Sequence, residues 1–388
     1  MKFAHLGDCH LGSWRIPALQ QLNLQSFQKA IELCMREKVD FVLIAGDLFD
    51  SAYPPIEILK ETFSELKKLK DAEIPCFIIA GSHDYSASGK TFLDVLEKAG
   101  FCVNVFKPEV RQDKIILNPE ICGQVAIYGY PGKKSGLEVE ELRKVKLQEA
   151  PGFFRVFMLH TSIQGAIGSL PIESIKEQEL PEADFYPLGH LHIDYENGKF
   201  VYSGPIFPNN LQELEELKYG SFYIIKVDQG KMSYEKIKIK LKEVEILDLE
   251  IKNALIANEV INTEIKKRNL RDKILILKLS GKLERGKISN IDFQEIENLA
   301  KELGAFAIVK STSQLSVEEA KLEIEVSDMD KIEETIISNY VKEKPSQFSS
   351  FIPSLMNSLA LEKQEDEKSS IFEARLFDEI SKILNIQI

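Results

Sequence analysis

The sequence lacks any hydrophobic run long enough to cross a membrane. A membrane span needs about 18 or more consecutive apolar residues, and no apolar segment of this 388-residue chain approaches that length. The chain enters a strand-like run at Lys2 without the pattern of a signal peptide. Its 44% hydrophobic and 28% charged residues are typical of a soluble globular protein. We therefore expect no membrane association and two or three domains.

Cysteine is also scarce. The five cysteines are odd in number and include no Cys-x-x-Cys pair, which indicates reduced thiols in a cytoplasmic protein. Cys9 lies between two candidate metal ligands, Asp8 and His10. Because neighbouring side chains at a strand end diverge, we interpret Cys9 as a packing residue.

An excess of positive charge is missing too. The net charge of −12 argues against a protein that binds nucleic acid through bulk charge alone. One segment differs: Glu264–Lys287 holds nine basic and three acidic residues, so its charge is +6 and the rest of the chain carries −18. Each single lysine there is best explained as solvated surface, but the cluster as a whole is a candidate phosphate-binding patch. Its candidate DNA contacts are Lys266, Lys267, Arg268 and Arg271.

Apolar runs and amphipathic segments alternate along the first half of the chain. Phe41–Ala45 and Cys76–Ala80 read as buried strands, whereas Leu22–Lys38 and the segment from Pro54 to Lys70 have helical periodicity. This alternation predicts an α/β class with a largely parallel sheet. The pattern changes near Val244 and again at Pro345, where two apolar helical stripes flank a charged linker. We expect domains over 1–243, 244–344 and 345–388, the last too short to build its own core.

Residues of the metal-ligand type follow several of these apolar runs. Five of the six histidines lie in such positions, together with aspartates. Imidazole with carboxylate suits Mn, Fe or Zn, and the set is too large for one tetrahedral zinc with an open position. Two metals that share a carboxylate fit better, and such pairs clamp a phosphate ester. The residues are Asp8, His10, Asp47, Asp50, Ser82, His83, Asp84, His160, His190 and His192.

These motifs resemble those of the calcineurin-like metallophosphoesterases. Within them, His5–Gly12, Gly46–Phe49 and Leu188–His192 are most similar to the nuclease subunit of the double-strand-break repair complex, the archaeal meiotic recombination eleven and bacterial SbcD family. The resemblance extends to the domain order. It implies a metallophosphoesterase β-sandwich flanked by helices, a smaller α/β cap that contacts DNA and a C-terminal helical tail.

The resemblance also implies roles for the ligand-type residues. Two Mn²⁺ per subunit would be bound, with Mg²⁺ or another divalent metal as alternatives. Asp8, His10, Asp47 and His192 would hold one metal, and Asp47, Ser82, His160 and His190 the other. His83 would act on the leaving 3′-oxygen, with Asp50 or Asp84 fixing its tautomer.

Two positions depart from the family pattern. The superfamily usually has asparagine where this chain has Ser82. The serine hydroxyl reaches less far from the backbone than an asparagine amide oxygen does. Close nuclease relatives often have histidine where this chain has Asp50. The nuclease assignment therefore rests more on domain order than on Asp50.

Further contacts are candidates. Trp14, the single tryptophan, is either a packed loop aromatic, which we favour, or a surface that stacks a displaced base. Arg15 and Lys90 lie in loops beside motifs, where either meets a phosphate or is solvated. In the tail, Phe372, Leu376, Ile380 and Ile383 form an apolar stripe that fits a partner groove.

The leading hypothesis is a Mn-dependent 3′–5′ exonuclease and single-strand endonuclease. It would process double-strand ends, single strands and hairpins as a homodimer with a coiled-coil ABC-type ATPase, near the nucleoid of a prokaryote. One alternative is a phosphatase or phosphodiesterase of small molecules. Another is a DNA-end-binding scaffold whose second metal site is weakened by Ser82.

Overall fold

The computed structural model describes residues 1–86, 89–133, 136–168, 171–317, 351–359, 361, 363 and 369–384. The chain divides into two compact units, Met1–Val317 and Glu318–Ile388. Among the described residues, no helix has the length and apolar character that a membrane crossing requires.

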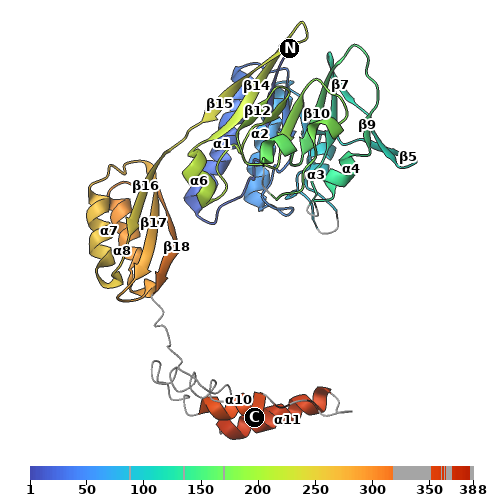
Figure 1. The fold of residues 1–388 in the computed structure, drawn as a ribbon. Helices are drawn as coiled ribbons and strands as arrows, with labels where there is room; N and C mark the ends of the chain where they lie inside the picture. The colour runs from blue at the N-terminus through green and yellow to red at the C-terminus, as the bar shows by residue number, and fades with distance from the viewer. Residues whose placement is uncertain are drawn as a thin grey trace. The chain divides into compact units, whose positions relative to one another are not determined.

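Two six-stranded sheets form the body of the first unit (Figure 1). The order of one is β15-β14-β1-β2-β3-β4, with β1 (Lys2–Leu6), β2 (Phe41–Ala45), β3 (Cys76–Ile79), β4 (Val103–Asn104), β14 (Gly220–Asp228) and β15 (Lys231–Ile239). The order of the other is β12-β13-β11-β10-β8-β7, with β7 (Glu120–Cys122), β8 (Val125–Tyr130), β10 (Phe154–His160), β11 (Tyr186–Gly189), β12 (Tyr195–Asn197) and β13 (Phe200–Tyr202).

The two sheets pack on each other through an apolar layer. Phe3 stacks on Phe41 within the first sheet, with ring centroids 4.7 Å apart, and lies 6.0 Å from Phe185 just before β11. These rings are fully buried or nearly so. The predicted α/β sandwich is therefore confirmed, with a core that joins both sheets.

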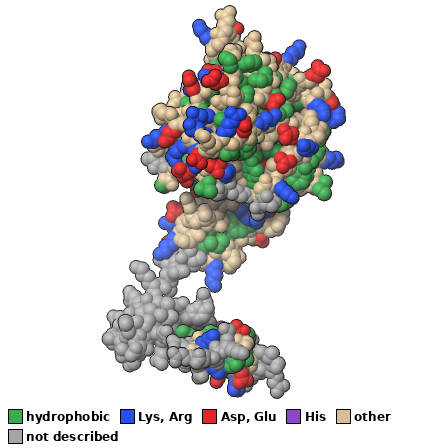
Figure 2. Space-filling view, turned by 90° about the vertical axis from the view of Figure 1, so that its right-hand side faces the viewer, with side chains coloured by type: hydrophobic (Ala, Val, Ile, Leu, Met, Phe, Trp, Pro, Cys, Tyr) green, Lys and Arg blue, Asp and Glu red, His purple; other side chains and the backbone are tan. Residues whose placement is uncertain are grey.

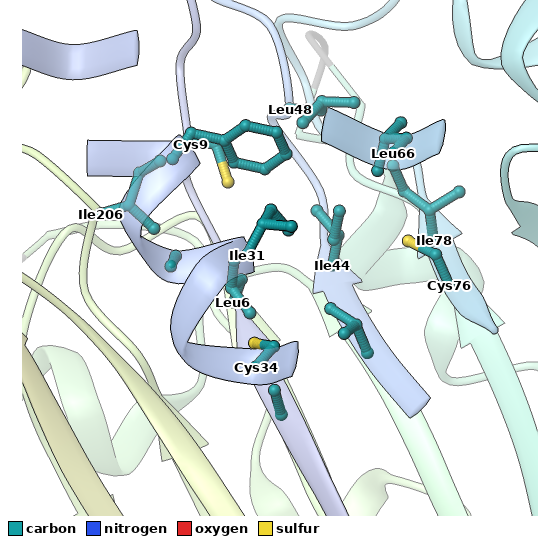
Figure 3. Close-up of a cluster of buried hydrophobic side chains, with 14 of the residues drawn as sticks. Leu6, Cys9, Ile31, Cys34, Ile44, Leu48, Leu66, Cys76, Ile78 and Ile206 are labelled. Carbon is teal, nitrogen blue, oxygen red and sulfur yellow. The ribbon is translucent and has the colours of Figure 1, made fainter. Parts of the chain in front are cut away.

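Helices cover the outer face of the first sheet. They are α1 (Pro17–Arg36), α2 (Ile56–Asp71) and α3 (Leu93–Lys98). In Figure 3, Ile31 and Cys34 of α1 face Leu6 and Ile44 of the sheet. Cys9 is fully buried in the same cluster, so its interpretation as a packing residue is confirmed.

The second sheet is covered on its outer face by shorter elements. These are α4 (Glu138–Leu142), α5 (Gln164–Ile167) and a small sheet of β5 (Pro108–Arg111), β6 (Lys114–Leu117) and β9 (Val145–Leu147). A further helix, α6 (Leu211–Leu217), precedes β14.

A three-stranded parallel sheet follows the sandwich. It consists of β16 (Glu243–Glu250), β17 (Lys273–Leu283) and β18 (Ala307–Val317), with α7 (Ala257–Lys266) and α8 (Phe293–Glu302). Ile276 of β17 joins one apolar cluster with Leu22 of α1 and Leu214 of α6. The small sheet thus packs directly on the helices that flank the ligand-type residues.

Several element boundaries differ from the sequence prediction: α1, expected over Leu22–Lys38, begins at Pro17, and two other helices begin later than expected. The helix expected from Pro54 begins at Ile56, because Pro55 keeps an extended backbone and the residue before a proline avoids the helical region. The segment Ile251–Lys267 also has the periodicity of a helix, but α7 begins only at Ala257, because Asn253 accepts a hydrogen bond from the Leu255 amide (3.0 Å) and starts a short 3₁₀ turn first.

The second unit contains α10 (Ile352–Leu359) and α11 (Ser369–Leu384), which contact each other. The predicted stripe Phe372, Leu376, Ile380 and Ile383 lies on α11 and is half-buried. Ile371 and Phe377 remain 57% and 62% exposed. The expected domain boundary between residues 344 and 345 lies outside the described residues.

Candidate metal centre

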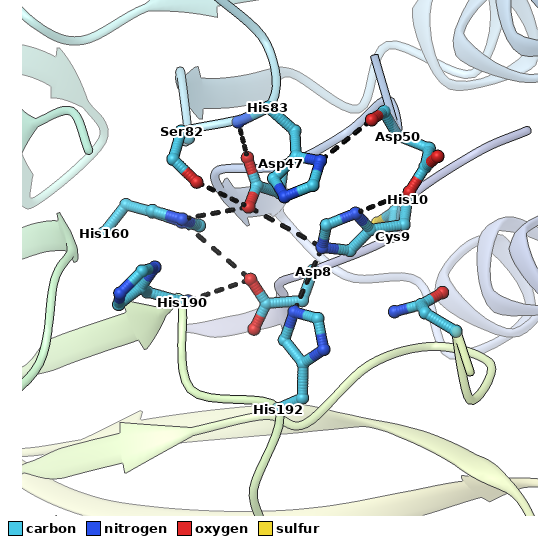
Figure 4. A network of polar contacts seen from close by, with 12 residues as sticks. Asp8, Cys9, His10, Asp47, Asp50, Ser82, His83, His160, His190 and His192 are labelled. Carbon is cyan, nitrogen blue, oxygen red and sulfur yellow. Dashed lines mark hydrogen bonds and ion pairs between the residues drawn. The ribbon is translucent and has the colours of Figure 1, made fainter. Parts of the chain in front are cut away.

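The ligand-type side chains come from the carboxyl ends of strands in both sheets. Asp8 and His10 follow β1, and Asp47 follows β2, which pairs with β1 in parallel. His160 ends β10, and His190 follows β11, again a parallel neighbour. Parallel pairing brings these ends to one edge of each sheet. Figure 4 shows the side chains pointing toward a common centre.

The backbone around this centre is strained. Asp8, His10, Asp47 and His190 all have positive φ angles, of 50°, 42°, 48° and 97°. Left-handed conformations are costly for residues with a Cβ and cluster at functional sites. Gly81 is required by close approach, because a Cβ there would lie 2.2 Å from Asp47 Oδ1. The loops are therefore shaped to bring their side chains together.

Asp47 occupies the middle of the cluster. Its Oδ1 accepts the His83 amide (2.7 Å), and its Oδ2 lies 3.1 Å from His160 Nε2 and 3.6 Å from His10 Nε2. The Ser82 hydroxyl donates to Oδ2 at 3.5 Å. Burial acts to raise the pKa of Asp47, but His160 and the other neighbours hold that pKa below its usual value.

Two buried atoms beside Asp47 have no hydrogen-bond partner. They are Asp8 Oδ2 and His160 Nε2, and the latter has only the ion-pair contact with Asp47 Oδ2 at 3.1 Å. The Nδ1 of His160 lies 2.9 Å from the Ala45 carbonyl, which fixes the proton on Nδ1 and leaves the Nε2 lone pair directed at the centre. Burial lowers the pKa of His160, yet Asp47 and Asp8 raise it to about 10, so that without a metal cation Nε2 binds a proton, which a bound cation would displace. An unpartnered carboxylate oxygen and imidazole nitrogen at one point fit a bound metal cation.

A second convergence involves His10 and His192. The Nδ1 of His10 is 3.3 Å from Asp50 Oδ1, and the Nδ1 of His192 is 2.8 Å from Glu213 Oε1. When both carboxylates accept Nδ1–H, the two Nε2 lone pairs face each other across 3.0 Å. Such lone pairs repel unless a proton or a metal cation lies between them. This arrangement again fits a metal ion.

In the described part of the chain, three groups of His and Asp residues have ligand atoms within 4.8 Å of one another. They are Asp8 with His10 and His192, Asp8 with Asp47 and His160, and His10 with Asp50 and His83. His190 adjoins them: its amide donates to Asp8 Oδ1 (2.8 Å), and its ring centroid is 5.2 Å from that of His160. Burial, followed by His160, lowers the pKa of His190 to about 4, so the ring is neutral and able to ligate.

The surroundings of His83 show which of the two candidate partners, Asp50 or Asp84, contacts its ring. Its ring is exposed, and its Nδ1 lies 2.8 Å from the backbone carbonyl of Asp50. The carboxylate of Asp50 contacts His10 instead. The carboxylate of Asp84 is buried and accepts the amides of Gly81 (2.9 Å) and Phe49 (3.1 Å). The partner of the His83 ring is therefore a carbonyl, because both carboxylates are occupied elsewhere.

Glu213 is a site residue that the sequence interpretation missed. It holds His192, and its other oxygen accepts the Asn209 amide at 2.8 Å. Asn210 caps α6 by accepting the Glu213 amide at 2.9 Å. Asn210-x-x-Glu213 is the pattern of a capping box, which marks a helix start and places Glu213 on its first turn. The pattern predicts where the helix starts, but the contact between Glu213 and His192 depends on the fold.

We expect Glu213→Ala to weaken divalent-metal binding by about 10- to 100-fold, because the outer partner of a ligating histidine fixes its tautomer and orientation. Calorimetric titration with MnCl₂ measures the change. Glu216→Ala is the matched control, since Glu216 lies on the same helix and contacts only Gln212 in the described structure. Equal affinities for the two variants would contradict the role of Glu213.

Trp14 is packed rather than free. Its Nε1 donates to the Pro208 carbonyl at 2.7 Å, and its half-buried ring packs on the cluster that contains Leu19 and Phe207. This agrees with the packing role that the sequence favoured. Arg15 and Lys90 are both exposed.

The basic cluster lies on the small sheet, at the end of α7 and in the turn before β17. Its four side chains are exposed. Lys267 pairs with Glu264 (2.6 Å), and Arg268 with Glu245 (3.2 Å), so acidic neighbours offset part of its charge. On the face shown in Figure 2, basic and acidic side chains are interspersed, in keeping with a chain that carries no bulk positive charge.

Comparison with known proteins supports these observations. Residues 1–194 match the calcineurin-like phosphoesterase family. An uncharacterized metallophosphoesterase, YhaO of Bacillus subtilis, is 27% identical over 252 residues, which cover 61% of this chain and 59% of that protein. The DNA double-strand break repair protein Mre11 of Archaeoglobus fulgidus is 23% identical over 96% of this chain and 83% of its own. Mre11 of Methanocaldococcus jannaschii is 29% identical, over 76% and 77%.

Proposed function

The chain belongs to the calcineurin-like phosphoesterase family, and from this premise we propose that it is a metal-dependent DNA nuclease that acts on DNA ends. The observation that carries the proposal is the convergence of Asp8 Oδ2, His160 Nε2 and the facing imidazoles of His10 and His192 on one region between the two sheets. The relatives named as DNA double-strand break repair proteins match most of the chain, beyond the phosphoesterase segment. This extent supports DNA as the substrate.

We propose two Mn²⁺ ions as the cofactor. Asp8, His10, Asp47 and His192 would hold one, and Asp47, Ser82, His160 and His190 the other. When bound, such ions polarise the phosphate and lower the pKa of an attacking water. Ser82 donates to Asp47 here, and its hydroxyl reaches less far than an amide oxygen. The histidine-rich set favours Mn²⁺ over Mg²⁺, which prefers oxygen ligands.

The proposed role of His83 follows from its single fixed nitrogen. The Asp50 carbonyl accepts Nδ1–H, so protons are gained and lost at Nε2. The exposed ring faces the substrate side, where Nε2–H would stabilise or protonate the leaving 3′-oxygen. Asp50 has two tasks: its carbonyl orients His83 and its carboxylate orients His10.

The remaining contacts are extensions of the proposal. We place DNA phosphates on Arg15, Lys90 and the basic cluster of Lys266, Lys267, Arg268 and Arg271, all of them exposed. We place a coiled-coil ABC-type ATPase on the tail, because α11 keeps Ile371 and Phe377 exposed beside its apolar stripe. Apolar helix faces of this kind bind in grooves.

A nuclease assay on end-labelled DNA tests the proposed function. We expect cleavage with Mn²⁺ to exceed that with Mg²⁺, and metal titration of the folded protein to show two sites. The assay is run with and without the ATPase, whose addition should increase end processing. A single tight zinc without hydrolysis would contradict the two-metal centre. Hydrolysis of a small chromogenic phosphodiester without any DNA cleavage would point to a small-molecule phosphodiesterase instead.

A further inference from the structure

One side of the metal centre opens into a hollow of about 720 Å³. Ser82, His83 and His190 line it on the side of the reacting groups. The rest of its lining comes from the segment Asp50–Tyr53 and from Ser86, Lys133, Gly136 and Glu138. His10, His192 and Glu213 do not belong to its lining. The hollow therefore adjoins the half of the centre that carries His83, where the leaving group departs in the proposed mechanism.

Tyr53 is the aromatic side chain of this hollow, and it is 72% exposed. A single exposed aromatic residue on a protein surface needs no special explanation. Tyr53 is different because its ring lines the same hollow as the exposed His83. Trp14, the other aromatic candidate near the motifs, is held by Pro208 and packed against the core.

The loop that carries Tyr53 is held in place. The Tyr53 amide donates to the Ser51 hydroxyl at 3.1 Å, and Pro54 and Pro55 follow directly. The local turn and the fixed φ of proline reduce the number of conformations open to the loop. Because little freedom remains to be lost, a ligand that contacts Tyr53 meets a small entropic cost.

The hollow also contains one ammonium, that of Lys133, which shares the lining with the carboxylate residues Asp50 and Glu138. The ammonium of Lys133 is held by the two oxygens of Glu141 at 2.5 and 2.6 Å, and it remains partly exposed. Glu141 also accepts from the Tyr130 hydroxyl. The hollow thus combines an aromatic face, a positioned ammonium and the reacting histidine. A nucleoside next to a phosphodiester presents the matching groups: a base with a π-face and a neighbouring phosphate.

We propose that this hollow is the subsite for one unstacked nucleoside beside the scissile phosphate, with Tyr53 as the platform on which its base stacks. The proposal rests on the proposed nuclease function and specifies its substrate. A base can lie on Tyr53 only after it leaves the helical stack, so the subsite selects unpaired or frayed nucleotides. Stacking tolerates every base because each has a π-face, so no sequence preference follows.

The test removes the ring and the base separately. Single-stranded oligonucleotides with one cleavable phosphodiester carry either a normal nucleotide or an abasic residue on its 5′ or its 3′ side. For the unaltered protein, removal of the base on one side should lower kcat/KM by about 5- to 100-fold, the usual range for one aromatic–base stack. For Tyr53→Ala, the normal and abasic substrates should be cut equally. Tyr53→Phe keeps the ring and should keep the ratio.

Two controls isolate the effect of Tyr53. Tyr219→Ala removes an aromatic ring that contacts Lys238, 5.0 Å away, and that does not line the hollow. It should retain the full preference for a base. Metal titration of Tyr53→Ala should match that of the unaltered protein, because Tyr53 contacts no proposed ligand in the described structure. The proposal is overturned if Tyr53→Ala still prefers the substrate with a base. It is also overturned if the unaltered protein cuts DNA without any such preference.

A fluorescence measurement separates this proposal from the nuclease assignment. The probe is 2-aminopurine, as a nucleoside 5′-monophosphate and within an oligonucleotide, with EDTA present so that no cleavage occurs. Stacking on Tyr53 should quench the probe in the unaltered protein and in Tyr53→Phe, but not in Tyr53→Ala. Quenching without DNA cleavage would retain the nucleoside subsite and refute the nuclease function. DNA cleavage without Tyr53-dependent quenching would retain the nuclease function and refute the nucleoside subsite at Tyr53.

Discussion

Replacing His83 by alanine should slow phosphodiester cleavage by about 10²- to 10⁴-fold, the usual contribution of one positioned proton donor, and leave both metal ions bound. The ring is exposed, its described hydrogen bond is to the Asp50 carbonyl, and it lies edge-on to the His10 ring with centroids 4.7 Å apart. The Asp47 carboxylate contacts the main-chain amide of His83, which alanine retains. Loss of the side chain therefore leaves the cluster of ligands intact.

Two measurements check this prediction. Metal titration of His83→Ala should reproduce the two sites of the unaltered protein, while the rate on a small phosphodiester falls. His83→Gln is the matched variant. Its side-chain amide can donate a hydrogen bond over a similar distance, but it cannot give up a proton as an acid. It should recover little of the rate. A variant that loses metal together with activity would make His83 a ligand.

The ligand set could be read from the sequence because each residue follows an apolar run. Phe41–Ala45 and Cys76–Ile79 are strands, as predicted, and parallel pairing brings Asp47 and Ser82 to one edge. This inference needs only local pattern and the geometry of parallel sheets. The same reasoning placed Asp8, His160 and His190, whose spatial proximity the structure shows.

The partners of those residues could not be read in the same way. The task of the Asp50 carboxylate depends on which of two nearby histidines its side chain faces, and that choice is made by the loop. The sequence leaves Asp84 a candidate partner of His83, but its carboxylate turns inward to main-chain amides. Such contacts join segments distant in sequence, and no local periodicity encodes them.

Glu213 adds a connection between the metal centre and the small sheet. It lies on α6 and holds His192, while its neighbour Leu214 is fully buried in the cluster that includes Ile276 of β17. On the same helix, Glu215 pairs with Lys278 of β17 at 2.6 Å. Any shift of the small sheet against α6 therefore acts on a residue that orients a proposed ligand.

Replacing Asp47 by asparagine should remove both metal ions, whereas Asp8→Asn should remove one ion and lower the affinity for the other only slightly. Asp47 lies within 3.6 Å of both His160 Nε2 and His10 Nε2, so its oxygens adjoin both proposed positions. Asparagine keeps the shape and still accepts the His83 amide, but it lacks the negative charge that offsets the cation. The metal affinity should fall by more than about 100-fold, which is the upper end for removal of an outer partner of a ligand.

Titration of Mn²⁺ followed by electron paramagnetic resonance counts the bound ions in each variant, since only free Mn²⁺ gives the sharp signal. Asp50→Asn is the control, because its carboxylate contacts only the Nδ1 of His10 among the proposed ligands and should cost no more than an outer partner. Two ions retained in Asp47→Asn would contradict any role of Asp47 as a ligand, and one ion retained would separate the sites. Asp47 would then belong to one ion alone, and the facing Nε2 atoms of His10 and His192 would have to hold the other with Asp8 as their only carboxylate.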